Sequence, residues 1–241
     1  MKNYLVNELI SEFQALANPK KARLLQRYFK TGKGQYGEGD VFLGINVPKT
    51  RKIAKKYSNK INLSESENLI YNKIHEIRLA GLLILVHQYQ KANKAVKKEI
   101  YDFYLKHSKQ INNWDLVDLT APRIVGDYLS DKSNKRNILY QLAKSENLWQ
   151  KRISIISTFA FIQDNQLKDT LKISEILLKD KHDLIHKAVG WALREMGKKN
   201  KKVLISFLNK HYKNIPRTTL RYAIEKFPEK ERKKWLTKDK K

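Results

Sequence analysis

The sequence predicts an all-α fold, organised as an α-solenoid in which pairs of helices stack one after another. Apolar residues recur every three or four positions through most of the 241 residues, which is the helical period. Only five prolines and nine glycines interrupt this pattern, mostly between the periodic segments. The one extended stretch, Asp40–Val47, has no neighbouring segment with which to pair, so we expect it to be a loop.

Four helical segments resemble one another, which predicts the repeats. Aligning one basic residue from each places Arg78, Arg152, Lys187 and Arg221 in register, in steps of 74, 35 and 34 residues. Because 74 is about two repeats, the period lies in the mid-thirties, as in helical-repeat proteins. Unrelated amphipathic helices also resemble one another loosely, but the regular spacing favours repeats. We therefore expect one helical-repeat domain, residues 1–241, whose concave face is long enough to hold a duplex.

The net positive charge of the chain limits the kinds of molecule that it is expected to bind. The chain has 50 Lys and Arg against 24 Asp and Glu, a net charge of +26. Such a surplus suits a polyanionic partner, either nucleic acid or an anionic membrane. At 41% hydrophobic residues the chain is too apolar to be a disordered basic tail. The N-terminus has no signal-peptide pattern, and the longest apolar run, Leu79–Val86, is too short to span a bilayer. The lack of cysteine fits a reducing cytoplasm.

Two short motifs resemble known sites without the context that those sites need. The segment GKGQYG, residues 32–37, fits G-x-G-x-x-G, but a helix precedes it and a loop follows, the reverse of a dinucleotide site. The segment HDLIH, residues 182–186, has the histidine spacing of a zinc hydrolase. There Asp183 replaces the expected glutamate and no third ligand follows, so we expect no metal site.

The helix expected from Asp183 to Lys198 carries a tryptophan on its polar side. Opposite its apolar face lies a stripe at helical spacing, made of Lys187, Trp191, Arg194 and Lys198. A large aromatic ring among cations suits contact with a sugar, a base or a cationic ligand. The alternative is that Trp191 covers a neighbouring helix.

Arg152 shows the opposite arrangement. Ile155, Ile156 and Phe159 share its flank of the predicted helix. A guanidinium among apolar groups is unfavourable unless a carboxylate or a phosphate meets it. We therefore expect Arg152 to have an anionic partner.

The segment INNWDLVDLTAPRIVGDY, residues 111–128, holds the least ordinary pair. Asn112 or Asn113 can cap a helix that begins at Trp114, and Asp115 then complements the helix dipole. Asp118 lies four residues after Trp114, so the two side chains share one face of the helix. A carboxylate on a surface that faces phosphates repels them. We therefore expect Asp118 to perform chemistry or to neutralise Arg152.

These residues carry a resemblance to a known family. The segments NNWDLVDLTAPRIVGDYL, LWQKRISIISTF and HKAVGWALREMGK resemble the AlkD family of bacterial DNA alkylation repair glycosylases, as does YFKTGKGQYGEGDVFLGINVP. The similarity covers nearly the whole chain. It implies HEAT-like helical repeats with a basic concave face that cradles duplex DNA. It also implies excision of cationic bases such as 3-methyladenine and 7-methylguanine, the first step of base excision repair.

The resemblance also assigns residues. It implies that Asp118 is the catalytic carboxylate, that Trp114 and Trp191 are the two active-site tryptophans, and that Arg152 is the active-site arginine. Asn46 stands where the best-known members carry glutamine. Residues expected to contact DNA, at this position and in basic rows on successive repeats, are Asn46, Lys187, Arg194 and Arg221.

A cationic alkylpurine leaves as a neutral base, so one carboxylate suffices and no general acid is needed. We therefore expect a monofunctional glycosylase without metal or organic cofactor, acting as a monomer on damaged duplex DNA in the bacterial cytoplasm, at the nucleoid. The main alternative is a non-catalytic helical-repeat protein that binds damaged or branched DNA. A second alternative is a solenoid scaffold for an acidic protein or RNA.

Overall fold

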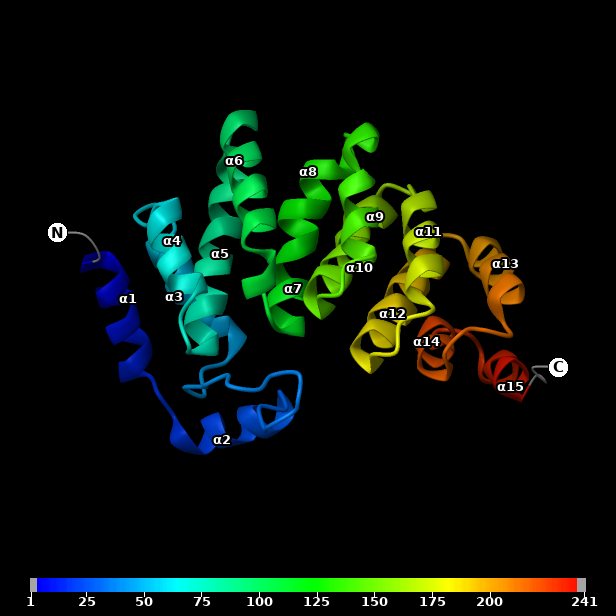
Figure 1. Cartoon of the computed structure of the whole chain (residues 1–241), viewed down its shortest axis with the longest axis horizontal. Coiled ribbons are helices and arrows are strands. Elements are labelled where there is room, and N and C mark those ends of the chain that lie inside the picture. The colour runs from blue at the N-terminus through cyan, green and yellow to red at the C-terminus, as the bar shows by residue number, and fades with distance from the viewer. Residues whose placement is uncertain (1–3, 238–241) are drawn as a thin grey trace. The chain divides into compact units, whose positions relative to one another are not determined.

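The computed structural model describes residues 4–237, and these residues form an all-helical fold (Figure 1). The helices, in chain order, are α1 (Tyr4–Ala15), α2 (Pro19–Tyr28), α3 (Val47–Tyr57), α4 (Leu63–Ile70), α5 (His75–Lys91), α6 (Lys94–Lys106), α7 (Trp114–Ala121), α8 (Asp127–Ser130), α9 (Asn137–Ala143), α10 (Leu148–Gln163), α11 (Lys168–Leu177), α12 (Asp183–Lys199), α13 (Lys201–His211), α14 (Arg217–Ala223) and α15 (Glu229–Thr237). A π-helical turn, Pro122–Gly126, follows α7. Within residues 4–237 no strand forms, as the sequence predicts.

The chain divides into two compact units, Met1–Thr120 (unit 1) and Ala121–Lys241 (unit 2). The single domain expected over residues 1–241 stays a prediction. Residues 1–3 and 238–241 of that range lie outside the described part.

Unit 1 is built around α5. This helix packs against α3, α4 and α6, and α1 contacts α3, α4 and α5. Side chains on every side of α5 are buried, from His75 to Val86. The apolar run Leu79–Val86, which is too short to span a membrane, therefore lies at the centre of the hydrophobic core of unit 1.

A long loop joins α2 to α3, as predicted for residues 40–46, whereas Val47 is the first residue of α3. The expectation that this segment has no pairing neighbour is wrong, because Val41 forms an isolated parallel β-bridge with Ile74.

The loop's backbone N–H groups at Leu43, Gly44 and Ile45 all donate to the buried carboxylate of Glu76, at 3.0, 2.8 and 3.1 Å. Gly44 has φ +84°, and a Cβ atom there would lie 2.4 Å from the backbone oxygen of Asn18. Only glycine fits this conformation without strain. The loop is thus held rigidly against α5, which fixes the positions of the residues around it.

Unit 2 contains the predicted repeats. Helices α10, α12 and α14 form one row, with α10 against α12 and α12 against α14. Helices α9 and α11 contact each other, each packs on α10, and α11 also packs on α12 (Figure 1). This two-layer stacking of helix pairs is that of an α-solenoid. Arg152, Lys187 and Arg221 lie on α10, α12 and α14, so the alignment of these basic residues marks equivalent helices.

The row of helices in unit 2 depends on close approach. A Cβ atom at Gly190 of α12 would lie 2.5 Å from Cβ of Tyr222 and 2.7 Å from the backbone oxygen of Thr219, both on α14. These distances are shorter than van der Waals contact, so the two helices pack this tightly only because residue 190 has no side chain. Among residues 4–237, no helix is both long enough and apolar enough to cross a bilayer.

Candidate active site

Unit 1 contains two of the predicted catalytic residues, Trp114 and Asp118, on α7. The helix begins at Trp114, as predicted, and Asn113 occupies the capping position. The Asn113 side chain accepts the Trp114 N–H at 2.8 Å and donates to Asp40 at 3.1 Å. Trp114 and Asp118 are both partly buried and lie one turn apart on this helix. Trp114 and Asp118 therefore share one face of α7, as predicted. Asn113 ties the first turn of α7 to Asp40 in the α2–α3 loop.

The indole of Trp114 rests on a cluster of aromatic rings. It stacks on Phe29 with the ring centroids 5.1 Å apart and an interplanar angle of 11°. Phe29 in turn stacks on Phe42 at 4.9 Å, and Tyr28 meets Trp114 edge-on at 5.9 Å. Aromatic packing of this kind adds to the stability gained from burial alone. It holds the tryptophan ring in one orientation beside Asp118.

A buried ion-pair network anchors the same corner of unit 1. His75 lies between Asp115 at 2.8 Å and Asp40 at 3.3 Å, and Asp40 also accepts from Arg78 at 2.6 Å. Burial opposes the charged imidazole, but Asp115 and Asp40 outweigh it and raise the pKa of His75 to about 9. The ring is therefore an imidazolium that donates from both nitrogens. Asp115, expected only to complement the helix dipole, clamps α7 to α5.

This network was not predicted, because Asp40, His75 and Asp115 are far apart in the sequence. Burial disfavours ionised Asp40, yet hydrogen bonds and charge from His75 and Arg78 hold the pKa of Asp40 below its usual value. Phe42 stacks on the His75 ring at 4.5 Å. The network and the aromatic cluster are therefore one continuous support behind Trp114. No local pattern in the sequence signals it.

Asp118 also influences the interior of unit 1. The hydroxyl of Tyr104 is buried and bonds to Thr120 at 2.8 Å. Burial raises the pKa of Tyr104, the hydrogen bond with Thr120 opposes this rise, and the negative charge of Asp118 adds to it. The Asp118 carboxylate thus lies close enough to Tyr104 for its charge to act on the buried hydroxyl.

Arg152 lies in unit 2 and is buried, with 5% of its surface exposed. Its Nη1 donates to the backbone oxygen of Leu184, in the first turn of α12, at 2.8 Å. The guanidinium therefore joins α10 to the start of α12. An anionic partner for Arg152 stays a prediction.

Trp191 is partly buried on α12. Phe159 of α10 meets its ring edge-on with the centroids 4.6 Å apart, and the indole N–H donates to Glu195 at 3.2 Å. Trp191 and Phe159 also line a cavity of about 310 Å³ beside α10 and α12. The tryptophan therefore covers a neighbouring helix and also borders an open space. A contact of Trp191 with a sugar, a base or a cationic ligand stays a prediction.

The expected cationic stripe of α12 also contains a carboxylate. Glu195 binds Lys198 at 2.7 Å and Arg194 at 3.2 Å, and Arg194 forms a second ion pair with Glu225 of unit 2. The positive charge around Trp191 is therefore smaller than the spacing of basic residues predicts. The signal was present in the sequence, because Glu195 lies four residues after Trp191 and so shares its face.

Two further predicted DNA-binding residues come together in unit 2. Lys187 and Arg221 line a cavity of about 520 Å³ with Arg232. Lys187 is paired with Asp183, one turn earlier, at 2.8 Å. Arg221 is exposed. Successive helices α12 and α14 thus each bring a basic side chain to one hollow.

Asn46, the remaining predicted DNA contact, caps a helix. Its side-chain oxygen accepts the N–H of Lys49 at 3.1 Å, in the first turn of α3. The side chain is exposed. A DNA contact at Asn46 stays a prediction.

The histidine pair of HDLIH also has structural partners. His182 caps α12 by accepting the N–H of Leu184 at 3.1 Å, and His186 Nε2 lies 2.6 Å from the backbone oxygen of Asp180. Burial lowers the pKa of His182. Both rings are therefore engaged in holding the start of α12.

Comparison with known proteins agrees with this fold. The sequence profile of the family described as "DNA alkylation repair enzyme" matches residues 9–227. A similar solved structure, a "Predicted DNA alkylation repair enzyme from Enterococcus faecalis", has a TM-score of 0.70 and 18% sequence identity, covering 88% of this chain and 97% of that one. At this identity the likeness concerns the fold alone. No curated protein sequence matches significantly. The protein belongs to the DNA alkylation repair enzyme family, and its role lies in the repair of alkylated DNA.

Proposed function

We propose that the protein is a monofunctional DNA glycosylase for base excision repair. It hydrolyses the N-glycosidic bond of cationic alkylated purines, such as 3-methyladenine and 7-methylguanine, in duplex DNA. The observation that carries this proposal is the pair on α7. Asp118 is a partly buried carboxylate one turn from Trp114, whose ring is stacked on Phe29 at 5.1 Å.

One carboxylate is enough for this reaction. An N3- or N7-alkylated purine already carries a positive charge, so the C1′–N bond breaks with its electron pair moving to the base, which leaves neutral. The sugar develops positive charge, which the carboxylate of Asp118 stabilises. Asp118 also positions the attacking water and accepts its proton as the new C1′–O bond forms. The reaction consumes only water, and because the base leaves neutral, we propose that it proceeds without a metal or organic cofactor.

The tryptophans supply selectivity for charged lesions. A cation over an indole face gains about 0.5–2 kcal/mol, an attraction that a neutral base lacks. Trp114 is held for this task by Phe29 and Tyr28. Trp191, held by Phe159 and Glu195, would offer a second ring.

The basic residues would bind and orient the DNA. Arg152 would contact a phosphate. Lys187, Arg194, Arg221 and Asn46 would contact the DNA backbone, with an affinity that falls steeply as salt rises. A net charge of +26 supports a polyanionic partner. We further propose that the protein acts as a monomer at the bacterial nucleoid in the cytoplasm, where its substrate lies.

Release of 7-methylguanine from a defined duplex at neutral pH, with a chelator present, tests the proposal. The wild type is compared with Asp118→Asn, which nearly preserves the shape of the side chain and removes its charge. We expect release by the wild type and a loss of at least a hundredfold in the variant, with DNA binding retained. Release in the presence of the chelator would show that no metal takes part.

The opposite result is equally informative. No release by either protein, with tight duplex binding by both, would leave a non-catalytic protein that binds damaged or branched DNA. The Trp114–Asp118 pair would then be structural.

A further inference from the structure

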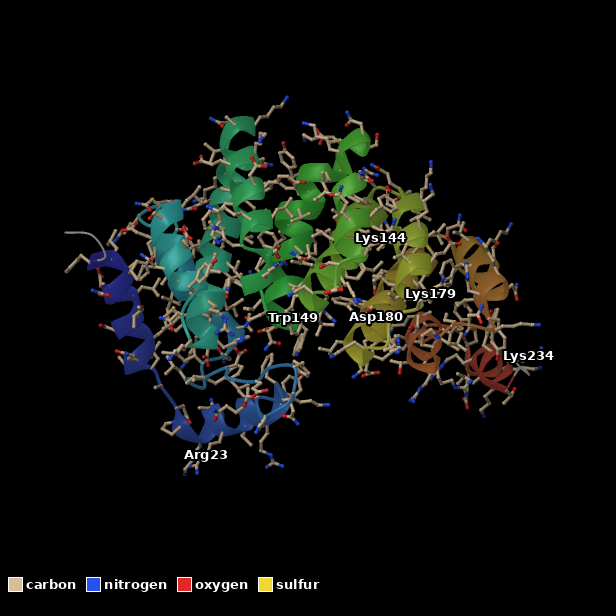
Figure 2. The ribbon with its side chains drawn as sticks, in the orientation of Figure 1. Arg23, Lys144, Trp149, Lys179, Asp180 and Lys234 are labelled. Atoms are coloured by element: carbon tan, nitrogen blue, oxygen red, sulfur yellow. The ribbon has the colours of Figure 1, made fainter. Side chains whose placement is uncertain are left out.

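Unit 2 contains a third and larger cavity, of about 710 Å³, away from Trp191 and Arg221. Two interhelical loops form it, the one between α9 and α10 and the one between α11 and α12. Lys144 belongs to the first loop, and Lys179 and Asp180 belong to the second (Figure 2). Neighbouring repeats therefore contribute equivalent loops to one hollow.

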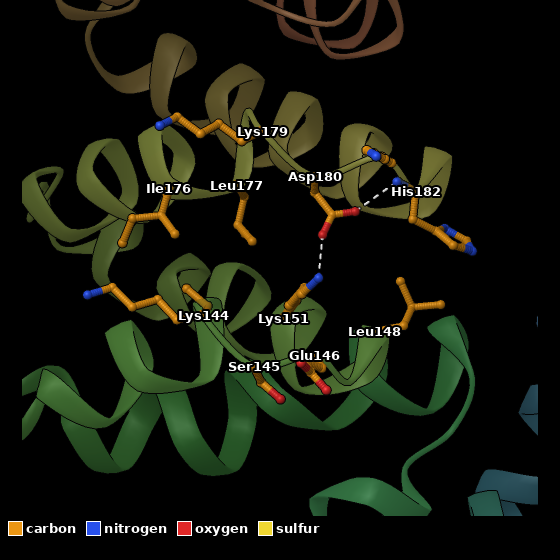
Figure 3. A pocket seen from close by; sticks show the side chains of 12 residues that line it. Lys144, Ser145, Glu146, Leu148, Lys151, Ile176, Leu177, Lys179, Asp180 and His182 are labelled. Atoms are coloured by element: carbon orange, nitrogen blue, oxygen red, sulfur yellow. Dashed lines mark hydrogen bonds and ion pairs between the residues drawn. The ribbon is translucent and has the colours of Figure 1, made fainter.

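The lining of this pocket has a surplus of positive charge. Four lysines face two carboxylates, Glu146 and Asp180. One lysine and one carboxylate neutralise each other, because Lys151 forms an ion pair with Asp180 at 2.6 Å (Figure 3). His182 adds no charge, since burial lowers its pKa and its ring accepts a backbone N–H. The three lysines without an ion pair among the described residues are Lys144, Lys179 and Lys181.

The geometry suits an extended ligand with anionic groups and apolar faces. The side chains of Lys144 and Lys179 extend to the same side of the pocket, with Ile176 between them (Figure 3). Leu148 and Leu177 also line the pocket. A sugar–phosphate backbone has this combination, since phosphates alternate with the apolar faces of deoxyribose. A free inorganic anion would make no use of the apolar lining.

The pocket adjoins residues of the proposed function on their own helices. Arg152 lies one turn after the pocket residue Leu148 on α10, and Lys187 of α12 lies five residues after the pocket residue His182. One turn is about 5.4 Å along the helix axis, and nucleotides of one strand are spaced by about 3.4 Å along the duplex. A strand that passes Arg152 therefore needs only a few further nucleotides to reach Lys144 and Lys179.

We propose that this pocket is a binding subsite for the sugar–phosphate backbone of duplex DNA, a few nucleotides away from the damaged base. Lys144, Lys179 and Lys181 neutralise the phosphates, and Leu148 and Ile176 contact the sugars. This inference rests on the proposed function in one respect, the distance of the pocket from the damaged base. DNA binding at the pocket is measurable without catalysis.

The test compares two triple variants that change the net charge equally. The pocket variant is Lys144→Gln, Lys179→Gln and Lys181→Gln. The control variant is Lys168→Gln, Lys172→Gln and Lys202→Gln, three exposed lysines of α11 and α13 that do not line the pocket. The probe is a duplex of about 25 base pairs with one tetrahydrofuran abasic-site analogue, which no glycosylase can hydrolyse. Its dissociation constant is measured from 50 to 300 mM salt.

We expect the pocket variant to bind about tenfold more weakly or worse near 150 mM salt. The slope of log K against log salt should become shallower by about two to three, because each lost phosphate contact removes about 0.9. The control variant should stay within about threefold of the wild type, with an unchanged slope. Equal effects of the two variants would overturn the proposal.

A second measurement locates the contact. Single methylphosphonate linkages, which are neutral, are placed one at a time within about six nucleotides of the abasic-site analogue. At one or two positions they should weaken binding by the wild type but not by the pocket variant. The same set of sensitive positions in both proteins would overturn the inference. Pocket-dependent binding by a wild type that releases no 7-methylguanine would sink the glycosylase proposal and leave the subsite intact.

Discussion

Glu195 accepts the indole N–H of Trp191 at 3.2 Å, one turn earlier on α12. Burial would raise the pKa of Glu195, but Lys198 and Arg194 lower it, so the carboxylate stays ionised at neutral pH. Phe159 packs against the same indole in a T-shaped arrangement, with the ring centroids 4.6 Å apart. The ring that we expect to contact the cationic base is therefore oriented from two sides. Glu195 is a positioning residue rather than a catalytic one.

Replacing Glu195 tests this role. Glu195→Ala should lower the single-turnover rate of 7-methylguanine release about tenfold, because a misplaced ring loses its favourable geometry. Glu195→Gln keeps an acceptor for the indole N–H and should remain within about threefold of the wild type. DNA affinity should not fall in either variant, since a negative charge is removed. A rate unchanged in Glu195→Ala would show that Phe159 alone fixes the ring.

Phe29 should matter both to folding and to Trp114. Removing this buried ring leaves a cavity and an unsupported indole, so Phe29→Ala should lower the free energy of unfolding by about 3–5 kcal/mol. Urea denaturation measures this change. Phe29→Leu preserves much of the volume and should be milder. If stacking positions Trp114, Phe29→Leu should still lose activity at a temperature at which it is fully folded.

The charge on His75 predicts a dependence of stability on pH. A pKa raised from 6.5 to about 9 in the folded state corresponds, at about 1.4 kcal/mol per unit, to about 3 kcal/mol of stabilisation. This contribution is fully present below pH 6.5 and is lost as the pH rises through about 9. The wild type should therefore become less stable between pH 6.5 and 9.5 in urea denaturation. His75→Gln should lack most of this decline, and an equally steep decline in that variant would assign it to other groups.

The close contact of α12 with α14 predicts a large effect of one methyl group. Gly190→Ala would place Cβ 2.5 Å from Cβ of Tyr222, so we expect destabilisation of about 1–3 kcal/mol despite the better helix propensity of alanine. Gly197→Ala on the same helix is the control. There the nearest atom is the end of the Leu204 side chain, which can rotate away. Thermal melting should separate the two variants clearly, and equal melting temperatures would contradict the tight packing of this row.

The sequence alone determined those features of the protein that depend only on residues close together along the chain. The 3.6-residue period determines that the chain is helical, and the spacing of Arg152, Lys187 and Arg221 identifies the equivalent helices α10, α12 and α14. The i, i+4 relation places Trp114 and Asp118 on one face. Each of these features follows from the geometry of a single helix or of a repeated unit.

The tertiary structure decided what surrounds those residues. The His75 network joins Asp40, His75 and Asp115, and the cluster behind Trp114 joins Phe29 and Phe42. Packing of unit 1 brings these residues together from four separate segments of the chain, so no spacing in the sequence signals their contact. The electrostatic environment of each side chain also depends on tertiary contacts, for the same reason. A count of basic residues sums over the whole chain, whereas a buried or paired side chain responds only to the few groups that folding brings within reach.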